Sequence, residues 1–228
     1  DLDMGMNDWV CDKFEWDDNV SYNKGKVLDY EALEKIDSFG RYLDSDNDGI
    51  CYRTYPGTHP EKGAYFTRGT SHDEYARYTE DGNINAQTLT RLMRKFRTAT
   101  DLVPEPIIEI NGEDSCGVIY YGSSKPAVLE AKDILKTKNI NLDLMQIRSF
   151  PFNLDVWEFI ANHDRIYVVE QNRDSQMRTL IMAEGGISAE ILRPLVHFTG
   201  DPIEASYIVN KISEREVNYK SHKNIKER

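Results

Sequence analysis

Residues suited to holding an anionic substrate are concentrated between positions 49 and 81 of this 228-residue chain. Arg53, Arg68 and Arg77 stand among tyrosines, glycines and carboxylates in segments that show little helical or strand periodicity. Arginine is well suited to a two-point grip on a carboxylate because its guanidinium is planar and stays charged. We therefore expect loops that bind an anion in this region.

The consecutive residues His72, Asp73 and Glu74 also carry side chains that can bind a metal ion or pass a proton. They belong to an expected loop, and adjacent loop residues do not by themselves fix a coordination geometry. We therefore interpret them as part of the loop surface, with a metal site or a proton relay as the alternative.

The segment from Asp44 to Gly49 begins like a calcium-binding loop, because the carboxylates of Asp44, Asp46 and Asp48 alternate before a glycine. The similarity ends at the twelfth position, which is Tyr55 instead of the glutamate that binds calcium through both oxygens. The pattern therefore favours a polar turn, and a weak magnesium or calcium site is the alternative.

The chain has two regions that differ in composition and in the periodicity of apolar residues. Pro104 and Pro106 mark the boundary near residue 103. The first region is mostly loop, with one clear helix. After the boundary, short β-branched runs alternate with amphipathic stretches, which predicts an α/β fold with a parallel sheet covered by helices. The helix of the first region is indicated by apolar residues on one face, namely Leu89, Leu92, Met93 and Phe96.

The pattern of the second region predicts four strands, each followed by a helix. The strands are expected at 117–121, 144–147, 165–170 and 194–198. Ser124, Asn153 and Asp201 are expected to cap helices, and another helix is expected around Met177. The tail at 214–228 is polar with mixed charges, so we expect it to be frayed or disordered.

In an open parallel sheet, ligands bind at the carboxyl ends of the strands. Three segments follow expected strands, at 121–124, 148–152 and 170–174. The first could hold an anion, although a glycine turn and a serine cap also serve simply to begin a helix. The third has five consecutive polar residues, which is more than one cap requires, so it indicates a binding site or a subunit interface.

The formal charge of −11 argues against nucleic acid and anionic membranes as partners. No apolar run approaches the roughly 20 residues that span a bilayer, and the start lacks the pattern of a signal peptide, so we expect a cytoplasmic protein. Cys11, Cys51 and Cys116 are few and include no CxxC pair, so one chain offers neither a disulfide framework nor a four-thiolate metal site. If this protein transfers electrons, we expect a partner to hold the iron and sulfur. The start at Asp1 suggests a fragment of a longer subunit.

Several blocks in the same order resemble the alpha subunit of 2-oxoacid:acceptor (ferredoxin) oxidoreductases, which are thiamine diphosphate enzymes, and most of all the 2-oxoglutarate type. The resemblance spans nearly the whole chain, which makes it more specific than any single motif. The blocks are 3–9 (DMGMNDW), 46–50 (DNDGI), 52–54 (YRT), 56–58 (PGT), 72–75 (HDEY), 77–81 (RYTED), 121–124 (YGSS), 148–152 (RSFPF) and 168–174 (VVEQNRD).

The resemblance implies that residues 1–103 are the C-terminal part of a pyrimidine-binding-like domain, and that 104–213 form a transketolase C-terminal-like domain. The implied reaction is the oxidative decarboxylation of a 2-oxoacid with coenzyme A to an acyl-CoA, carbon dioxide and reduced ferredoxin. The chain lacks the Gly-Asp-Gly motif for magnesium diphosphate and the Tyr-Pro-Ile-Thr-Pro substrate segment. The resemblance therefore places thiamine diphosphate, magnesium and the iron-sulfur cluster mainly on the beta subunit, and implies that this chain alone is inactive.

The resemblance also indicates which residues meet the substrate. Arg53 is expected to hold the 2-oxoacid carboxylate, and Asn172 to line the entrance for coenzyme A or substrate; no catalytic residue or metal ligand is assigned. Two alternatives stay open. One is a component of another thiamine enzyme, transketolase-like or a 2-oxoacid dehydrogenase, and the other is a non-catalytic interaction module.

Overall fold

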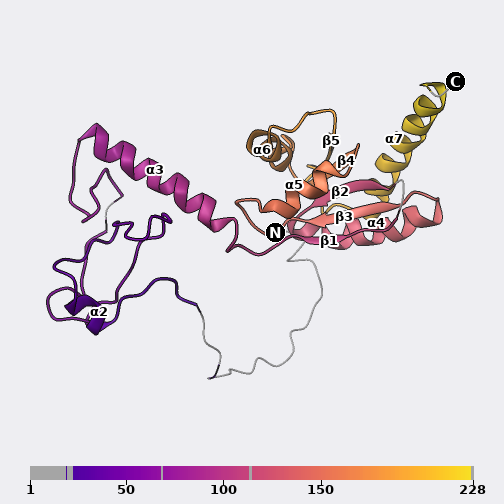
Figure 1. The fold of residues 1–228 in the computed structure, drawn as a ribbon. Coiled ribbons are helices and arrows are strands. Elements are labelled where there is room, and N and C mark those ends of the chain that lie inside the picture. The colour runs from indigo at the N-terminus through magenta and orange to yellow at the C-terminus, as the bar shows by residue number, and fades with distance from the viewer. Residues whose placement is uncertain (1–18, 20–22, 68, 113–114, 227–228) are drawn as a thin grey trace. The chain divides into compact units, whose positions relative to one another are not determined.

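The computed structural model describes residues 19, 23–67, 69–112 and 115–226. The chain divides into two compact units between Leu102 and Val103. We call residues 23–102 the loop unit and residues 103–226 the sheet unit, and each is described by itself (Figure 1). Block 3–9, which contributes to the family resemblance, lies outside the described residues, as do Cys11 and Arg68.

The described part of the loop unit has two helices, α2 (Tyr30–Glu34) and α3 (Gly82–Ala99). Each begins after an aspartate, Asp29 or Asp81, whose side chain accepts a hydrogen bond from a first-turn backbone N–H at 2.9 Å and 2.8 Å, respectively. The helix predicted from its apolar face is α3, yet none of its residues is buried. In the described part of this unit, the buried apolar residues are Leu33 and Ala76.

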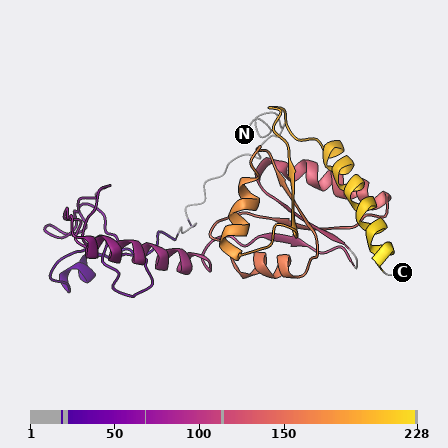
Figure 2. The same cartoon turned by 90° about the horizontal axis from the view of Figure 1, so that it is seen from above.

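The sheet unit is a five-stranded sheet, in the order β1-β3-β2-β4-β5, with helices on both faces (Figure 2). The four parallel strands confirm the predicted α/β class. They are β2 (Cys116–Tyr120), β3 (Leu142–Gln146), β4 (Ile166–Glu170) and β5 (Leu192–Val196). The helices are the short 3-10 helix η1 (Gly122–Ser124), α4 (Lys125–Thr137), α5 (Leu154–Ala161), α6 (Gln176–Gly185) and α7 (Ala205–Lys226).

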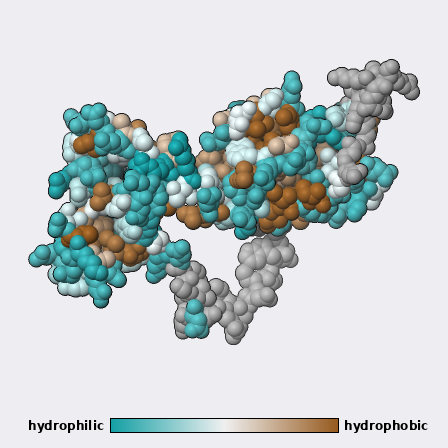
Figure 3. Space-filling model, in the orientation of Figure 1, coloured by the Kyte–Doolittle hydropathy of each residue, from teal (hydrophilic) through white to brown (hydrophobic). Residues whose placement is uncertain are grey.

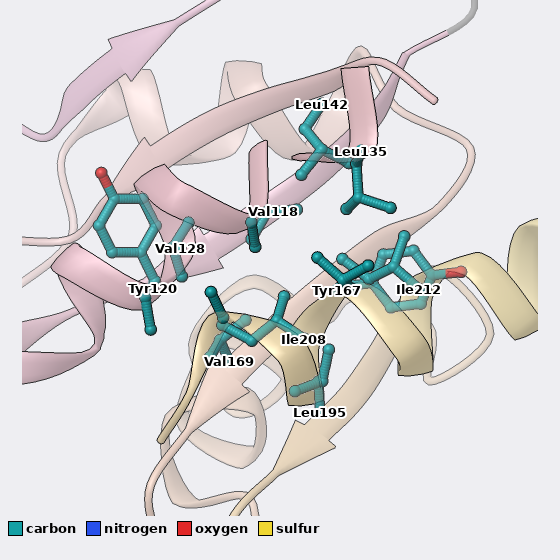
Figure 4. Packing of buried hydrophobic residues seen from close by; sticks show 14 of the residues in the cluster. Val118, Tyr120, Val128, Leu135, Leu142, Tyr167, Val169, Leu195, Ile208 and Ile212 are labelled. Carbon is teal, nitrogen blue, oxygen red and sulfur yellow. The ribbon is translucent and has the colours of Figure 1, made fainter. Parts of the chain in front are cut away.

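The core of the sheet unit has two layers because successive strand residues point to opposite faces. Val118 and Tyr120 pack in the layer beneath α4 and α7, whereas Ile119 packs in the layer beneath α5 and α6. Figure 4 shows the first of these layers. Strands β2 and β4 are buried along their whole length, as is usual for central strands of a parallel sheet.

The remaining strand, β1 (Ile107–Glu109), is not predicted by the sequence pattern. It pairs antiparallel to β3 at the edge of the sheet, with Ile108 opposite Met145. Pro104 and Pro106 precede it, and proline is tolerated at the start of an edge strand because no partner there needs its missing N–H. The division between the two compact units falls close to these prolines, and the prolines hide the short strand that follows.

Two expectations for the last helix are wrong. It begins at Ala205 instead of after Asp201, since the backbone N–H of Ile203 is directed to the Gln171 side chain at 3.4 Å and the Asp201 carbonyl accepts from His197 at 3.1 Å. It then continues through the tail that was expected to fray, as far as Lys226. Although α7 has 22 residues, neither it nor any other described helix has the length and apolar character to span a membrane.

A buried ion pair anchors the first part of the polar tail to the sheet. The Glu216 carboxylate of α7 accepts hydrogen bonds from Arg165 Nε at 2.9 Å and from the Tyr167 hydroxyl at 2.8 Å. The side chains of Arg165 and Glu216 are 6% and 2% exposed. Burial, followed by the Glu216 charge, raises the pKa of Tyr167, so the phenol stays protonated and donates. The network ties α7 to the start of β4.

We predict that Glu216→Leu lowers the free energy of unfolding by about 3 kcal/mol, because it leaves the Arg165 guanidinium buried without its carboxylate. Urea denaturation of the full chain measures the change. Glu214→Leu is the matched control, because Glu214 lies on the same helix and is exposed. Equal stability of the two variants would contradict a structural role for Glu216.

Candidate functional site

The carboxyl ends of β2 and β4 bring two of the three predicted segments together. Gln171, just after β4, donates from its side-chain amide to the hydroxyls of Ser123 and Ser124 at 3.1 Å and 3.3 Å. Ser124 stands at the predicted cap position of α4, but its hydroxyl makes no capping hydrogen bond. It meets Gln171 instead, so the serines serve the contact between loops and not the start of the helix.

The segment 148–152, which follows β3, contacts the chain before β1 and not the loops after β2 and β4. Ser149 donates to the Pro104 carbonyl at 2.6 Å, and Arg148 lies 3.5 Å from the Glu105 carbonyl. These contacts tie the 148–152 segment to the chain that leads into β1. The carboxyl edge of the sheet therefore has one connected polar group, formed by the loops after β2 and β4, beside a segment that fixes the edge strand.

Glu170 organises the connected group, and sequence reasoning did not single it out. Its carboxylate is fully buried at the end of β4 and accepts from the backbone N–H groups of Met177 and Arg178 at 2.8 Å and 2.9 Å. It therefore binds the first turn of α6, where the helix dipole favours a negative charge. A glutamate that ends an otherwise apolar strand is the sequence signal that could have identified it.

Asn172 is held within this loop through both ends of its side-chain amide. The amide nitrogen donates to Glu170 at 2.7 Å and lies 3.5 Å from the Tyr121 hydroxyl. The amide oxygen accepts from the backbone N–H groups of Asp174 and Gln176 at 3.1 Å and 3.2 Å. Asn172 therefore shapes the turn that begins α6, and its hydrogen-bonding capacity is used inside the protein.

The groups that this loop presents to solvent are Arg173 and Asp174, whose side chains are 75% and 57% exposed. They form an ion pair with each other at 2.7 Å, which contributes little to stability at such an exposed position. Beneath them, burial and then the Glu170 charge raise the pKa of Tyr121, so its hydroxyl is a hydrogen-bond donor at neutral pH.

Arg53 lies in the loop unit, on a short bridge between two backbone segments. Its N–H donates to the Lys26 carbonyl, and its carbonyl accepts from the Leu28 N–H, both at 2.8 Å. The side chain is exposed, and among the described residues no carboxylate pairs with its guanidinium. The next residue, Thr54, is fully buried, and its hydroxyl has no hydrogen-bond partner in the described structure. The backbone of Arg53 is thus fixed while its charge is available.

The acidic turn at 44–49 is held by cations of the chain itself. Lys26 lies 2.6 Å from both Asp46 and Asp48, and Arg94 lies 2.6 Å from Asp44. Desolvation acts against the charge of Lys26, but its hydrogen bonds to Asp46 and Asp48 outweigh this and raise its pKa. This arrangement supports the interpretation of a polar turn.

His72, Asp73 and Glu74 do not form a common coordination site. The His72 ring lies against Tyr42 and its Nδ1 contacts the Thr70 carbonyl at 2.7 Å. Asp73 accepts from two backbone N–H groups of the turn that follows it, at 2.8 Å and 2.9 Å. No group of three or more metal-binding side chains occurs within the described residues.

The loop unit contains a cavity of about 830 Å³ between α3 and the segments 42–47 and 73–77. Its lining includes Arg77, Arg91, Tyr42 and Tyr75, and does not include Arg53. Arg53 and Asn172 belong to different units, so each is a separate candidate contact and the described geometry defines no pocket that they share.

No protein-family model matches the chain. It is 27% identical over 204 residues to 2-oxoacid:ferredoxin oxidoreductase 2, subunit alpha, of Aeropyrum pernix, covering 86% of this chain and 30% of that protein. It is 26% identical over 175 residues to the 2-oxoacid:ferredoxin oxidoreductase subunit alpha of Saccharolobus solfataricus, covering 75% and 26%. The chain thus spans less than a third of the length of the curated relatives it matches.

A solved structure has a similar fold. It is the 2-oxoglutarate:ferredoxin oxidoreductase from Magnetococcus marinus, determined with 2-oxoglutarate, coenzyme A and succinyl-CoA bound. The TM-score is 0.67 at 23% sequence identity, and the match covers 78% of this chain and 30% of that chain. At this identity the similarity establishes the fold alone.

We predict that Glu170→Gln weakens the start of α6, because the amide replaces one acceptor oxygen with a donor that faces backbone N–H groups. The cost of about 1 to 3 kcal/mol for an unmade hydrogen bond corresponds to at least about a fivefold loss of hydrogen-exchange protection at Met177 and Arg178. Glu184→Gln, on an exposed position of the same helix, should leave that protection unchanged. Unaltered protection in Glu170→Gln would show that the carboxylate does not hold the helix.

The acidic turn leads to a pH prediction. Hydrogen bonds from Lys26 lower the pKa of Asp46 and Asp48 below the ordinary value of 3.8, so their stabilising contribution is complete above that pH and is lost as the pH falls through the lowered values. Carboxyl-carbon NMR titration should show both midpoints below 3.8 and rising toward it in Lys26→Met. Lys24→Met is the control, and identical midpoints in all three proteins would refute the pairing.

Proposed function

We propose that this chain, whose resemblance to the alpha subunits of 2-oxoacid:ferredoxin oxidoreductases is confirmed by its sequence relatives, forms the C-terminal part of such a subunit. The reaction is the oxidative decarboxylation of a 2-oxoacid with coenzyme A, with ferredoxin as electron acceptor. The observation that carries the proposal is the match to a curated alpha subunit across 86% of this chain. We propose 2-oxoglutarate as the 2-oxoacid, on the basis of the sequence blocks quoted above.

The cofactors of this reaction class are thiamine diphosphate, magnesium and an iron-sulfur cluster, and the described residues do not fit the metal or the cluster. Burial raises the pKa of the Cys116 thiol to about 12, and burial also raises that of Cys51, so neither favours the thiolate that an iron ligand requires. The acidic turn is occupied by Lys26 and Arg94. We propose that the beta subunit holds these groups, where thiamine diphosphate supplies the carbon–carbon bond cleavage.

The role proposed for Arg53 is to bind the substrate carboxylate. Its backbone is fixed by two hydrogen bonds of 2.8 Å, and its guanidinium is exposed and has no carboxylate partner among the described residues. Asp48, which lies five residues earlier in the sequence, pairs with Lys26 at 2.6 Å instead of with Arg53. A planar guanidinium held on a fixed backbone is suited to orient a carboxylate through two hydrogen bonds.

The role proposed for Asn172 is indirect. Its side chain fixes the loop between β4 and α6, and this loop presents Arg173 to solvent at the carboxyl edge of the sheet. Ligands of open parallel sheets bind at this edge. We propose that the loop forms part of the entrance for coenzyme A or the 2-oxoacid, with Asn172 setting its conformation.

We predict that Arg53→Lys, in the enzyme assembled with its beta subunit, lowers kcat/KM for the 2-oxoacid by about tenfold or more. Lysine keeps the charge and loses the two-point grip, and one charge-assisted hydrogen bond is worth about 1.5 to 3 kcal/mol. Subunit composition and cofactor content should be unchanged. Arg97→Lys is the control, because Arg97 is an exposed arginine of the same unit that does not line the cavity. A kcat/KM within twofold of the parent in an intact Arg53→Lys complex would exclude Arg53 as the substrate clamp.

A further inference from the structure

Helix α3 packs on the loop unit through its polar side. Arg94 contacts Asp44 at 2.6 Å, Arg91 donates to the Gly49 carbonyl at 3.1 Å, and the Thr98 hydroxyl donates to the Asp48 carbonyl at 2.5 Å. At about 100° per residue, Arg91, Arg94 and Thr98 form one side of the helix. The contact between α3 and the acidic turn is therefore made by charges and hydrogen bonds.

The close approach of Gly49 fixes which side of α3 faces inward. A Cβ at position 49 would collide with the backbone nitrogen and Cα of Lys95, and the residue has a φ of +82°, which favours glycine. The backbone of the acidic turn thus lies directly on the backbone of α3. The helix cannot turn its other side toward the unit without losing this contact.

The side that faces outward is apolar. Leu89 and Met93 are 55% and 60% exposed and recur at the spacing of one helical face, with Leu92 half-buried beside them. Phe96 continues this face at 47% exposure and already has an interaction partner within the chain. Amphipathic helices normally bury this side against their own core. Hydrophobic residues are exposed on both units (Figure 3), but on α3 they form a continuous stripe along a helix of 18 residues.

The charges that border this stripe are all positive. Helix α3 contains Arg91, Arg94, Lys95 and Arg97 and has no acidic residue. Lys95 and Arg97 lie on the two borders of the apolar stripe at about 100° per residue, are exposed, and have no acidic partner among the described residues. A basic helix with uncompensated borders is unusual in a chain whose formal charge is −11.

We propose that this apolar face of α3, with Lys95 and Arg97 at its borders, is a docking surface for another protein chain whose apolar contact area is bordered by carboxylates. Such a partner would bury the stripe and pair with both cations, so the contact is complementary in shape and in charge. The same face of a second copy would set basic borders against basic borders. The chain's negative charge opposes an anionic membrane. The inference rests on α3 and not on the enzyme assignment.

The test uses the full chain and two designed helical peptides that share one leucine stripe, bordered by glutamate in the first and by lysine in the second. Fluorescence anisotropy should show at least tenfold tighter binding of the glutamate-bordered peptide, weakening with added salt. Met93→Glu should reduce this binding tenfold or more. Phe198→Glu is the control, since Phe198 is equally exposed, at 60%, and lies in the sheet unit. Leu89→Gln provides a second variant if circular dichroism shows that Met93→Glu is misfolded.

Five outcomes would overturn the proposal. Equal binding of the two peptides, or binding that survives both α3 substitutions, would show that the face has no such preference. Absence of binding at peptide concentrations up to about 1 mM would remove the docking surface. Self-association in sedimentation experiments that Met93→Glu abolishes would make a second copy the occupant. Sedimentation with phosphatidylserine vesicles, again abolished by Met93→Glu, would assign the face to a membrane.

Discussion

A carboxylate that is removed from water must be given hydrogen-bond donors, and the sheet unit meets this requirement at both ends of β4. Glu216 is paired with Arg165 and Tyr167 at the amino end, and Glu170 accepts from the first turn of α6 at the carboxyl end. Helices α7 and α6 pack on opposite faces of the sheet. One central strand thereby positions a helix in each layer, and the remaining strands and helices pack beside these three elements.

The same requirement shapes the candidate functional edge. The chain between the Glu170 carboxylate and the N-terminus of α6 is a tight loop. The side-chain amides of Asn172 and Gln171 hold this loop against α6, η1 and the segment that leads into α7. What remains for an incoming ligand is the outer surface of that loop. Function at this edge would therefore depend on the shape of the loop more than on any single reactive group.

The parts of the fold that sequence patterns predict are those governed by local periodicity. Strands β2 and β4 are recognisable because continuous apolar runs stand between amphipathic stretches. Strand β1 and the end of α7 are not, because their stability comes from contacts with β3 and with Arg165 that lie far away in the sequence. The apolar face of α3 is predictable, but which side packs inward depends on the approach of Gly49. Arg53 and Asn172 were proposed from resemblance, and the contacts around Asn172 were not foreseeable.

The scarcity of buried apolar residues in the described part of the loop unit has a thermodynamic consequence. Leu33 and Ala76 are the buried hydrophobic residues of its described part, and the unit is otherwise held by pairs such as Lys26 with Asp46 and Arg94 with Asp44. The heat capacity change of unfolding is dominated by newly hydrated apolar surface. Calorimetry would thus find a small heat capacity increment per residue for this unit and a flat stability curve, whereas the sheet unit would show the strongly curved profile of an ordinary hydrophobic core.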